Sequence, residues 1–158
     1  MKRIKLDKID RKILRDLQAN GRITNVELSK NAGISAPPCL RRVRALEESG
    51  FIKGYYARLD TPTLGYGMSV FALIKLASQA ETELKKFEEK CTETRQIREC
   101  HMLSGEVDFL LRIVSKDWDD YQKFLTEELT ALENVVSVKT MPLVRSFKEK
   151  TGVPIDAD

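Results

Sequence analysis

A single segment, from Asp60 to Gly67, separates two regions of the 158-residue chain that have different hydrophobic patterns. Before it, apolar residues recur at the spacing of amphipathic helices. After it, short apolar runs alternate with helical patterns, as in a domain that mixes sheet and helix. The segment itself concentrates Thr, Pro and Gly, the residues of turns and linkers. We therefore predict two domains, a linker between them and a frayed tail, at residues 1–60, 68–150, 61–67 and 151–158 respectively.

The first domain begins with two short helices whose ends are marked by capping residues. Asp7 precedes an apolar helical stripe as an N-cap, and this helix is expected to end near Asn20. Thr24 and Glu27 have the spacing of a capping box, in which each side chain binds the other residue's backbone N–H. Gly33 is expected to end the second helix, because glycine readily adopts the left-handed conformation of a helix C-terminus.

A third helix is expected from Ser35 to Ser49, followed by a Tyr-rich segment, Phe51 to Asp60, with the pattern of a β-ribbon. Two helices joined by a tight glycine turn are typical of a helix-turn-helix, whose second helix enters the major groove of DNA. The ribbon would form the wing beside it. The first domain is therefore predicted to be a winged helix-turn-helix.

Basic residues are concentrated in this first domain. Residues 1–60 contain 14 Lys and Arg against 7 Asp and Glu, a net charge of +7, whereas residues 61–158 carry −4, within an overall +3. A basic module joined to a mildly acidic one favours binding of a polyanion by the first module. Duplex DNA is such a polyanion.

The third predicted helix carries arginines on a face separate from its apolar residues. At about 100° per residue, a side that includes Leu40 and Leu46 faces the first two helices, Arg41 and Arg44 lie opposite, and Arg42 lies on a flank. Guanidinium groups can contact phosphates or pair with guanine, although such a face can also be merely solvated. The candidate DNA-binding residues are Ser35, Pro37, Pro38, Arg41, Arg42 and Arg44.

Ser35 has a particular position at the start of this helix. Pro37 and Pro38 lack the backbone N–H groups to which an N-cap hydroxyl normally bonds. The Ser35 hydroxyl is therefore predicted to be free to contact a DNA phosphate. Capping of the helix is the alternative role.

The second domain has the βαββαβ order of a ferredoxin-like fold, which makes the chain α+β. Strands are expected at residues 68–76, 97–103, 107–114 and 135–147, and helices at 81–93 and 117–132. Trp118 and Tyr121 lie at helical spacing and are expected in the core. Because the runs Val70–Ile74 and Phe109–Leu111 are apolar at consecutive positions, both faces of the sheet need cover. Two helices cover one face, so a second copy of the sheet is expected on the other, which predicts a homodimer.

Several segments taken together point to a known family. They are Asp7-Lys-Ile-Asp-Arg-Lys-Ile-Leu14, Asn25-Val-Glu-Leu-Ser29, Cys39-Leu-Arg-Arg-Val43, Gly50-Phe-Ile52 and the run from Glu99 to Leu111. With them the chain resembles, over essentially its whole length, the Lrp/AsnC or leucine-responsive transcriptional regulators. The resemblance implies a winged helix-turn-helix joined to a ferredoxin-like amino-acid-sensing domain, which dimerises sheet to sheet and assembles further, commonly to octamers. It also implies control of genes for amino-acid metabolism.

The resemblance also places an effector site at the loop between the second and third strands, where dimers of the family meet. A free amino acid needs N–H groups for its carboxylate and an acceptor for its ammonium group. Gly105 lets the backbone approach a ligand, and Asp108 is a suitable acceptor. Alternatively, Gly105 only turns the hairpin and Asp108 only hydrogen-bonds the loop. The candidate effector-binding residues are Met102, Ser104, Gly105, Glu106, Val107 and Asp108.

Two other functions are open to this sequence. A tetrapyrrole decarboxylase-like enzyme would share the two-part architecture, but a single His and the lack of a nucleophile–base pair leave it few catalytic groups. An amino-acid-sensing module without DNA binding would have no use for the arginines. We expect a non-enzyme whose partners are double-stranded DNA, further copies of itself and a non-covalent amino-acid effector.

The composition also indicates where the protein resides. No apolar run reaches the roughly 20 residues that a membrane helix needs, and the N-terminus lacks the apolar core of a signal peptide. The three cysteines are far apart and lack the spacing of a zinc site, so they are expected to be reduced thiols used as small apolar residues. We therefore expect a cytoplasmic protein without metal, other cofactor or membrane partner.

Overall fold

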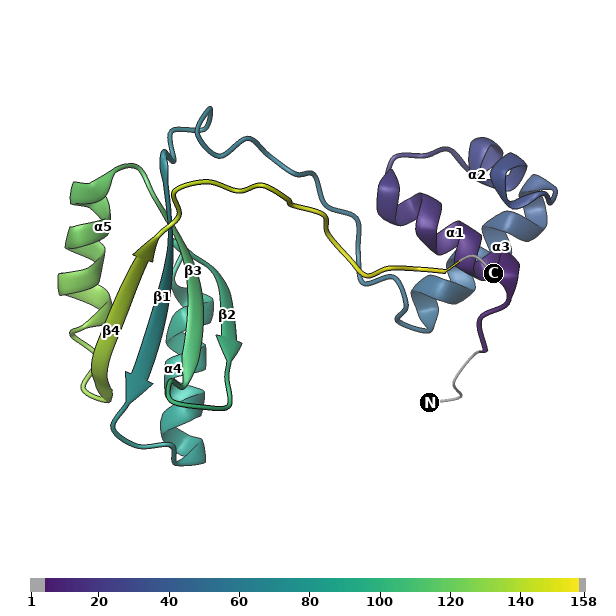
Figure 1. Ribbon diagram of the computed structural model, residues 1–158. Helices are drawn as coiled ribbons and strands as arrows, with labels where there is room; N and C mark the ends of the chain where they lie inside the picture. The colour runs from purple at the N-terminus through teal and green to yellow at the C-terminus, as the bar shows by residue number, and fades with distance from the viewer. Residues whose placement is uncertain (1–4, 157–158) are drawn as a thin grey trace. The chain divides into compact units, whose positions relative to one another are not determined.

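The computed structural model describes residues 5–156, which form two compact units. One unit, whose regular elements in Figure 1 are all helices, contains the described residues up to Arg58 together with the described residues from Lys148 onward. The other contains Leu59 to Phe147 and holds the sheet. The chain therefore passes from one unit to the other twice. Among the described residues, no helix combines the length and apolar character needed to cross a membrane.

The helical unit is built on three helices, α1 (Lys8–Ala19), α2 (Asn25–Ala32) and α3 (Ala36–Glu48). Their predicted start and stop signals are confirmed. Asp7 caps α1, Thr24 and Glu27 form the capping box of α2, and Gly33 ends α2 in the left-handed conformation at φ 73°. Each such cap satisfies backbone N–H or C=O groups that would otherwise lack partners, and is typically worth about 1 kcal/mol.

The three helices enclose a small apolar core. Its buried members are Ile13, Leu28, Ala32, Cys39 and Leu46. Burial raises the pKa of the Cys39 thiol, as expected for a cysteine used as an apolar residue. Leu40 was predicted to pack with this core but is 39% exposed, because it lies at the edge of the α3 face that contacts α1 and α2.

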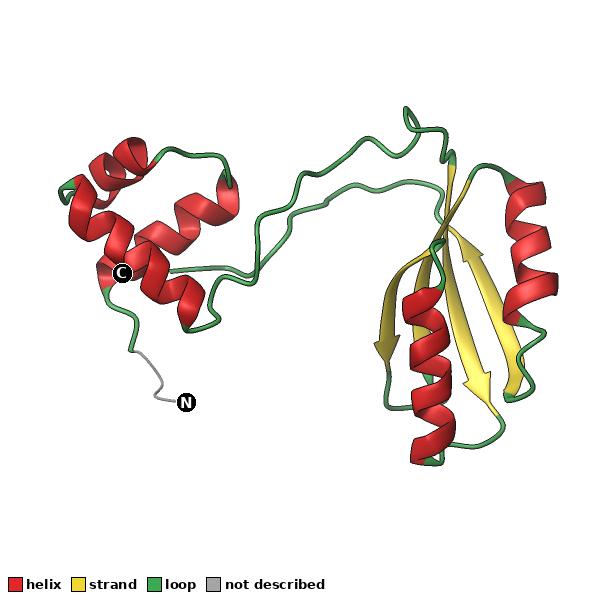
Figure 2. Cartoon of the chain, turned by 180° about the vertical axis from the view of Figure 1, so that it is seen from behind, coloured by secondary structure: helices red, strands yellow, loops and turns green. Residues whose placement is uncertain are grey.

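The β-ribbon predicted for Phe51 to Asp60 is not formed. The structure describes all ten of these residues and assigns none of them to a strand, and Figure 2 shows the segment as a loop. Tyr56 within it is 88% exposed. An extended segment becomes a strand only when a neighbouring strand accepts and donates its main-chain hydrogen bonds. Within residues 5–156, no strand pairs with this segment.

The second unit has the predicted ferredoxin-like βαββαβ order. Its elements are β1 (Met68–Leu76), α4 (Glu81–Glu93), β2 (Ile97–Met102), β3 (Phe109–Ser115), α5 (Trp118–Phe124) with a π-helical turn (Leu125–Leu129), and β4 (Val135–Pro142). The four strands are antiparallel to their neighbours in the order β2-β3-β1-β4. β1 and α4 have the predicted bounds, whereas β3 and β4 are shorter than expected.

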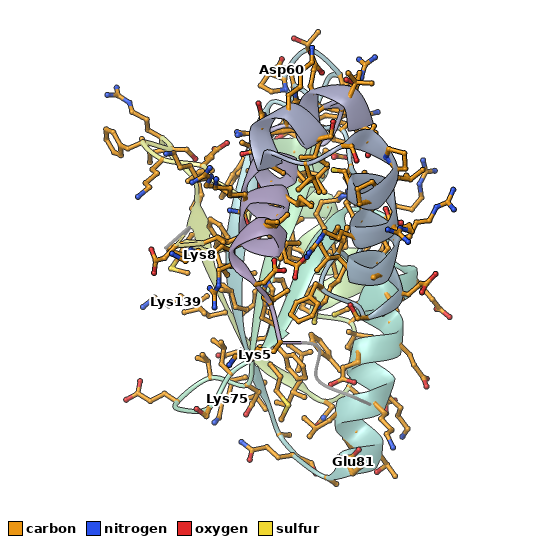
Figure 3. All side chains as sticks on the ribbon, turned by 90° about the vertical axis from the view of Figure 1, so that its right-hand side faces the viewer. Lys5, Lys8, Asp60, Lys75, Glu81 and Lys139 are labelled. Carbon is orange, nitrogen blue, oxygen red and sulfur yellow. The ribbon has the colours of Figure 1, made fainter. Side chains whose placement is uncertain are left out.

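The two faces of this sheet differ in how they are covered. On one face, alternate residues of β1 such as Val70 and Ile74 are fully buried beneath residues of α4 and α5. On the other, Phe71, Leu73 and the paired Leu110 are only half-buried. The strand register puts Lys75 and Lys139, labelled in Figure 3, on this open face as well. The open face thus has an apolar centre, as the sequence predicted, and the structure adds charged residues beside it.

The helix after β3 differs from the prediction in two respects. The α-helix ends at Phe124 and continues as a π-helical turn, so its residues shift position relative to a regular helix. Tyr121 is fully buried as expected and its phenol hydrogen-bonds the Thr140 hydroxyl at 2.7 Å. The expectation that Trp118 is a core residue is wrong, because Trp118 stands at the first position of α5 and is 52% exposed.

Candidate DNA-binding surface and effector loop

α3 presents a cationic side to solvent while its opposite side is buried. Cys39 is fully buried and Leu46 is 2% exposed, so this side of α3 is fixed against the core. Arg41 and Arg44 are exposed, and among the described residues neither has an ion pair or a side-chain hydrogen bond. Both guanidinium groups are thus available to bind an anion, and the packed helix behind them limits their positions.

Arg42 is used differently from its two neighbours. Its Nη1 lies 2.7 Å from a carboxylate oxygen of Asp7 and 2.7 Å from one of Asp10, both at the start of α1. These hydrogen bonds and charges raise the pKa of Arg42, while the Asp10 backbone N–H and then Arg42 lower the pKa of Asp7. Asp10 is almost fully buried. Arg42 therefore joins α3 to α1, and its charge is already neutralised within the unit.

The start of α3 is held from outside the helix. Ser35 is its N-cap residue but makes no capping hydrogen bond, in agreement with the effect expected of Pro37 and Pro38. Instead, Nδ2 of Asn25, the first residue of α2, donates to the carbonyl oxygen of Ala36 at 3.0 Å. The Ser35 side chain is left exposed at the tip of the helix, beside the two prolines.

The last turn of α3 is fastened as well. The Tyr55 hydroxyl donates to the carboxylate of Glu47 at 2.9 Å. Burial and this hydrogen bond raise the pKa of Tyr55 to about 12, so the phenol stays protonated at neutral pH. Asn25, Arg42 and Glu47 therefore fix the start, middle and end of α3, and the free arginines lie between these points.

The candidate effector loop connects β2 to β3 and is largely exposed. Ser104, Gly105 and Glu106 are all exposed, and Met102 is 58% exposed. Gly105 has φ 145°, a conformation that side chains other than glycine rarely adopt. The loop is closed by a hydrogen bond of 2.8 Å from the Leu103 N–H to the carbonyl oxygen of Asp108.

Asp108 is a buried residue at the base of this loop, only 4% exposed. Its Oδ2 accepts from the Leu76 N–H at 2.7 Å, and its Oδ1 accepts from Nε2 of Gln79 at 2.6 Å. Its backbone N–H donates to the carbonyl oxygen of Ile74 at 2.8 Å. Within the single chain, these bonds join the loop to the end of β1, which favours the second of the two roles expected for Asp108.

The chain has an open cleft elsewhere on the second unit. It has a volume of about 420 Å³ and is lined by residues from the ends of α4, β3 and α5, among them Lys90, Arg95, Lys116 and Asp120. These residues lie at the opposite end of β3 from the effector loop. None of the candidate effector residues lines this cleft, so the loop is a surface feature of the single chain.

Two features of the site were not found from the sequence. Asp10 stands three positions after Asp7, the spacing of a second capping box, and this box is present; the local pattern was therefore sufficient to find it. The bond from Asn25 to Ala36 has no local signal, because it depends on how α2 and α3 cross.

A helix-turn-helix with a free cationic helix face, joined to a ferredoxin-like unit, defines a class of DNA-binding transcription regulators with a separate ligand-binding domain. Two family models match this division of the chain. Residues 6–53 match a winged helix-turn-helix DNA-binding domain, and residues 69–153 match the Lrp/AsnC ligand-binding domain.

The chain belongs to the Lrp/AsnC family of transcriptional regulators. It is 50% identical over 153 residues to the leucine-responsive regulatory protein of Rhizobium meliloti, covering 97% of this chain and 98% of the relative. It is 41% identical over 150 residues to the Bkd operon transcriptional regulator of Pseudomonas aeruginosa, covering 95% and 98%.

Solved structures share the whole architecture. A transcriptional regulator from Neisseria meningitidis, crystallised as a complex with L-methionine, superposes with a TM-score of 0.91 at 32% identity over 96% of this chain and 98% of the other. An AsnC family regulator from Agrobacterium tumefaciens gives 0.87 at 34% identity over 94% and 97%. The expected fold and the expected function as a transcription regulator are thereby confirmed.

Proposed function

We propose that the protein binds specific duplex DNA sites through Arg41 and Arg44 and regulates genes of amino-acid metabolism in response to an amino acid. The observation that carries the DNA contact is the contrast among the three arginines of α3. Arg42 has two carboxylate partners, whereas the neighbouring guanidinium groups have none among the described residues. Such groups supply salt-dependent phosphate binding, and bidentate contacts to guanine supply base choice.

Ser35, Pro37 and Pro38 form the leading edge of this surface at the tip of α3. The uncapped Ser35 hydroxyl is suited to donate to a phosphate oxygen, and the prolines offer apolar contact with the sugar-phosphate backbone. Arg42 acts indirectly by holding α3 against α1. The direct DNA contacts are therefore assigned to five of the six candidate residues, all but Arg42.

The effector is proposed to bind at the loop formed by Met102, Ser104, Gly105, Glu106 and Val107, with Asp108 holding the loop in place. The exposed backbone of Gly105 can approach a carboxylate, and Met102 offers apolar surface to a ligand side chain. The complex of the Neisseria meningitidis regulator with L-methionine supports an amino acid as the ligand class. Because the loop is exposed in one chain, a neighbouring chain is expected to complete the pocket.

Self-association follows from the open face of the sheet. Phe71, Leu73 and Leu110 are only half-buried there, and a second copy of the same face would cover them in a two-fold dimer. Two recognition helices would then read two half-sites, and further association of dimers, to an octamer or another even assembly, would bring effector loops together.

The proposal is tested by two measurements on the unmodified protein. A gel shift on the DNA upstream of its own gene should show a specific complex that survives excess non-specific competitor. A thermal-shift screen of the standard amino acids, paired with light scattering, should find at least one that raises the unfolding temperature and changes the assembly size. Equal affinity for every DNA, or no response to any amino acid, would contradict the corresponding half of the proposal.

A further inference from the structure

The C-terminal segment of the chain docks on α1 of the DNA-binding unit. Gln18, in the last turn of α1, donates from Nε2 to the carbonyl oxygen of Val153 at 2.8 Å, and its Oε1 accepts from the Val153 N–H at 3.0 Å. One side-chain amide thus satisfies both main-chain groups of one residue, as an adjacent β-strand would. The residues 151–158, which were predicted to be frayed, therefore include a defined contact with a residue 135 positions earlier.

Two further features fit the tail to this position. Arg58 forms an ion pair with the carboxylate of Glu149 and donates to its carbonyl oxygen at 3.1 Å. Gly152 has φ 83°, and a Cβ at this position would overlap the Gln18 side chain. Glycine is therefore needed at residue 152 both for the backbone conformation and for the close approach of the tail to α1.

The docked tail creates a second connection between the units. The chain leaves the helical unit at Arg58 and forms the second unit, which carries the effector loop and is called the effector unit below. It returns to the helical unit at Lys148, shortly after the end of β4. β4 pairs with β1 along most of its length. The end of β4 is therefore joined to the docked tail through residues 143–147, in addition to the linker before β1.

We propose that the docked tail is a releasable second tether through which the amino-acid effector alters DNA affinity. This inference rests on the proposed function. Its strength suits such a role: Gln18 is exposed and its two bonds to Val153 are neutral, so each contributes modestly in water. Allosteric effectors typically change affinity by a factor of roughly 5 to 150, which contacts of this size can transmit. Release of the tail frees the helical unit to reorient about a single linker.

The test compares two variants that release the tail by different means. Gln18→Ala removes both hydrogen bonds to Val153, and a chain truncated after Lys150 removes the docked residue itself. Gln122→Ala is the matched control, since Gln122 is an exposed glutamine on α5 with no side-chain hydrogen bond among the described residues. For the wild type and each of the three variants, DNA affinity is measured on the upstream region of the protein's own gene, with and without saturating L-leucine or L-methionine.

The wild type and Gln122→Ala should show the same fold-change in DNA affinity on adding the amino acid. In Gln18→Ala and in the truncated chain this fold-change should fall towards one, while the unfolding temperature of the effector unit stays the same. Hydrogen exchange provides an independent readout: the Val153 amide should be protected in the wild type and should lose protection in Gln18→Ala.

Three results would contradict the proposal that the tail is a releasable tether. Wild-type fold-changes in both tail variants would show that the contact is packing alone. An exposed Val153 amide in the wild type would show that the tail is not docked in solution. A wild type that binds its operator but responds to no amino acid would remove the proposed sensing function, and the tether with it, while leaving the tail contact itself to be seen by hydrogen exchange.

Discussion

Around α3, polar side chains divide into those that hold the helix and those that remain free. The side chains of Asn25 and Arg42 bond to groups within the helical unit, whereas Arg41 and Arg44 are exposed. At the effector loop, by contrast, the buried carboxylate of Asp108 bonds to the end of β1, and what remains exposed is backbone, the apolar side chain of Met102 and two separate polar side chains, Ser104 and Glu106. A rigid helix can present a finished binding surface from one chain. An exposed loop without converging polar groups needs a second chain to become a pocket.

The largest stability effect is expected from Arg42→Ala. This variant tests whether Arg42 holds α3 against α1. The variant leaves the nearly buried Asp10 without its charged partner, and loss of such charge-assisted bonds costs about 2–3 kcal/mol. The unfolding free energy of the helical unit should fall by this amount, as measured by denaturant titration. Arg41→Ala, the control on the same helix, should change it by less than about 0.5 kcal/mol.

The same ion pair gives a dependence on pH with a definite sign. The pKa of Asp7 is lowered in the folded protein from its ordinary value of 3.8, so its stabilising contribution is fully present above 3.8 and is lost as pH falls through the lowered pKa. The stability difference between wild type and Arg42→Ala should therefore be constant near neutral pH and should shrink in acid. A difference that grows in acid would contradict the role given to Asp7.

The next largest effect is expected from Asp108→Ala. This variant tests whether the Asp108 carboxylate holds the loop to β1 or binds the effector. Removing the carboxylate leaves the Leu76 N–H and the Gln79 amide without their acceptor, at a cost of roughly 2 kcal/mol in the effector unit. Glu106→Ala, two positions away and exposed, should leave stability unchanged. If Asp108→Ala loses amino-acid binding at full stability, Asp108 binds the effector directly and does not serve mainly to hold the loop.

Asn25→Asp is expected to have a smaller effect that separates positioning from stability. The substitution keeps the shape of the side chain but replaces the donor to Ala36 with an acceptor, and a neutral bond of this kind contributes about 1 kcal/mol. Misplacement of the tip of α3 should lower affinity for the operator more than affinity for random DNA. Asn20→Asp, which keeps its acceptor bond from the Arg22 N–H at 3.0 Å, controls for the added charge.

The smallest effect is expected from Ser35→Ala. Because Ser35 makes no capping bond, the unfolding temperature should stay the same, whereas the loss of one phosphate contact should weaken operator binding about tenfold or less. Calorimetry and fluorescence anisotropy on the same sample separate the two quantities. A clear drop in unfolding temperature would mean that the hydroxyl caps the helix after all.

The predictions from sequence succeeded where the signal was local. Asp7, Thr24 and Gly33 set helix ends through bonds with residues a few positions away, and the bounds of α4 followed from apolar spacing. They failed where the partner was distant. Nothing near Gln18 indicates that Val153 docks on it, and the pattern of residues 51–60 does not reveal that no strand in the described part of the chain pairs with them.

The candidate site was predicted to a similar extent. Helical phase put Arg41 and Arg44 on the free side of α3 and left Arg42 on the flank, where only the fold could show its carboxylate partners. For Asp108, both roles were physically reasonable from the sequence; the structure adds that its side chain is buried at the end of β1 and hydrogen-bonded there, which favours the structural role within one chain.

DNA binding through Arg41 and Arg44 is tested most directly by an Arg41→Ala/Arg44→Ala double variant. Its affinity for operator and for random DNA is measured across a series of salt concentrations. If both groups contact DNA from a packed helix, the double variant should keep its unfolding temperature and lose operator affinity by roughly 1–3 kcal/mol for each base contact removed. Its salt dependence should also be less steep wherever a phosphate contact is lost. A folded double variant that binds its operator with wild-type affinity and wild-type salt dependence would contradict the account.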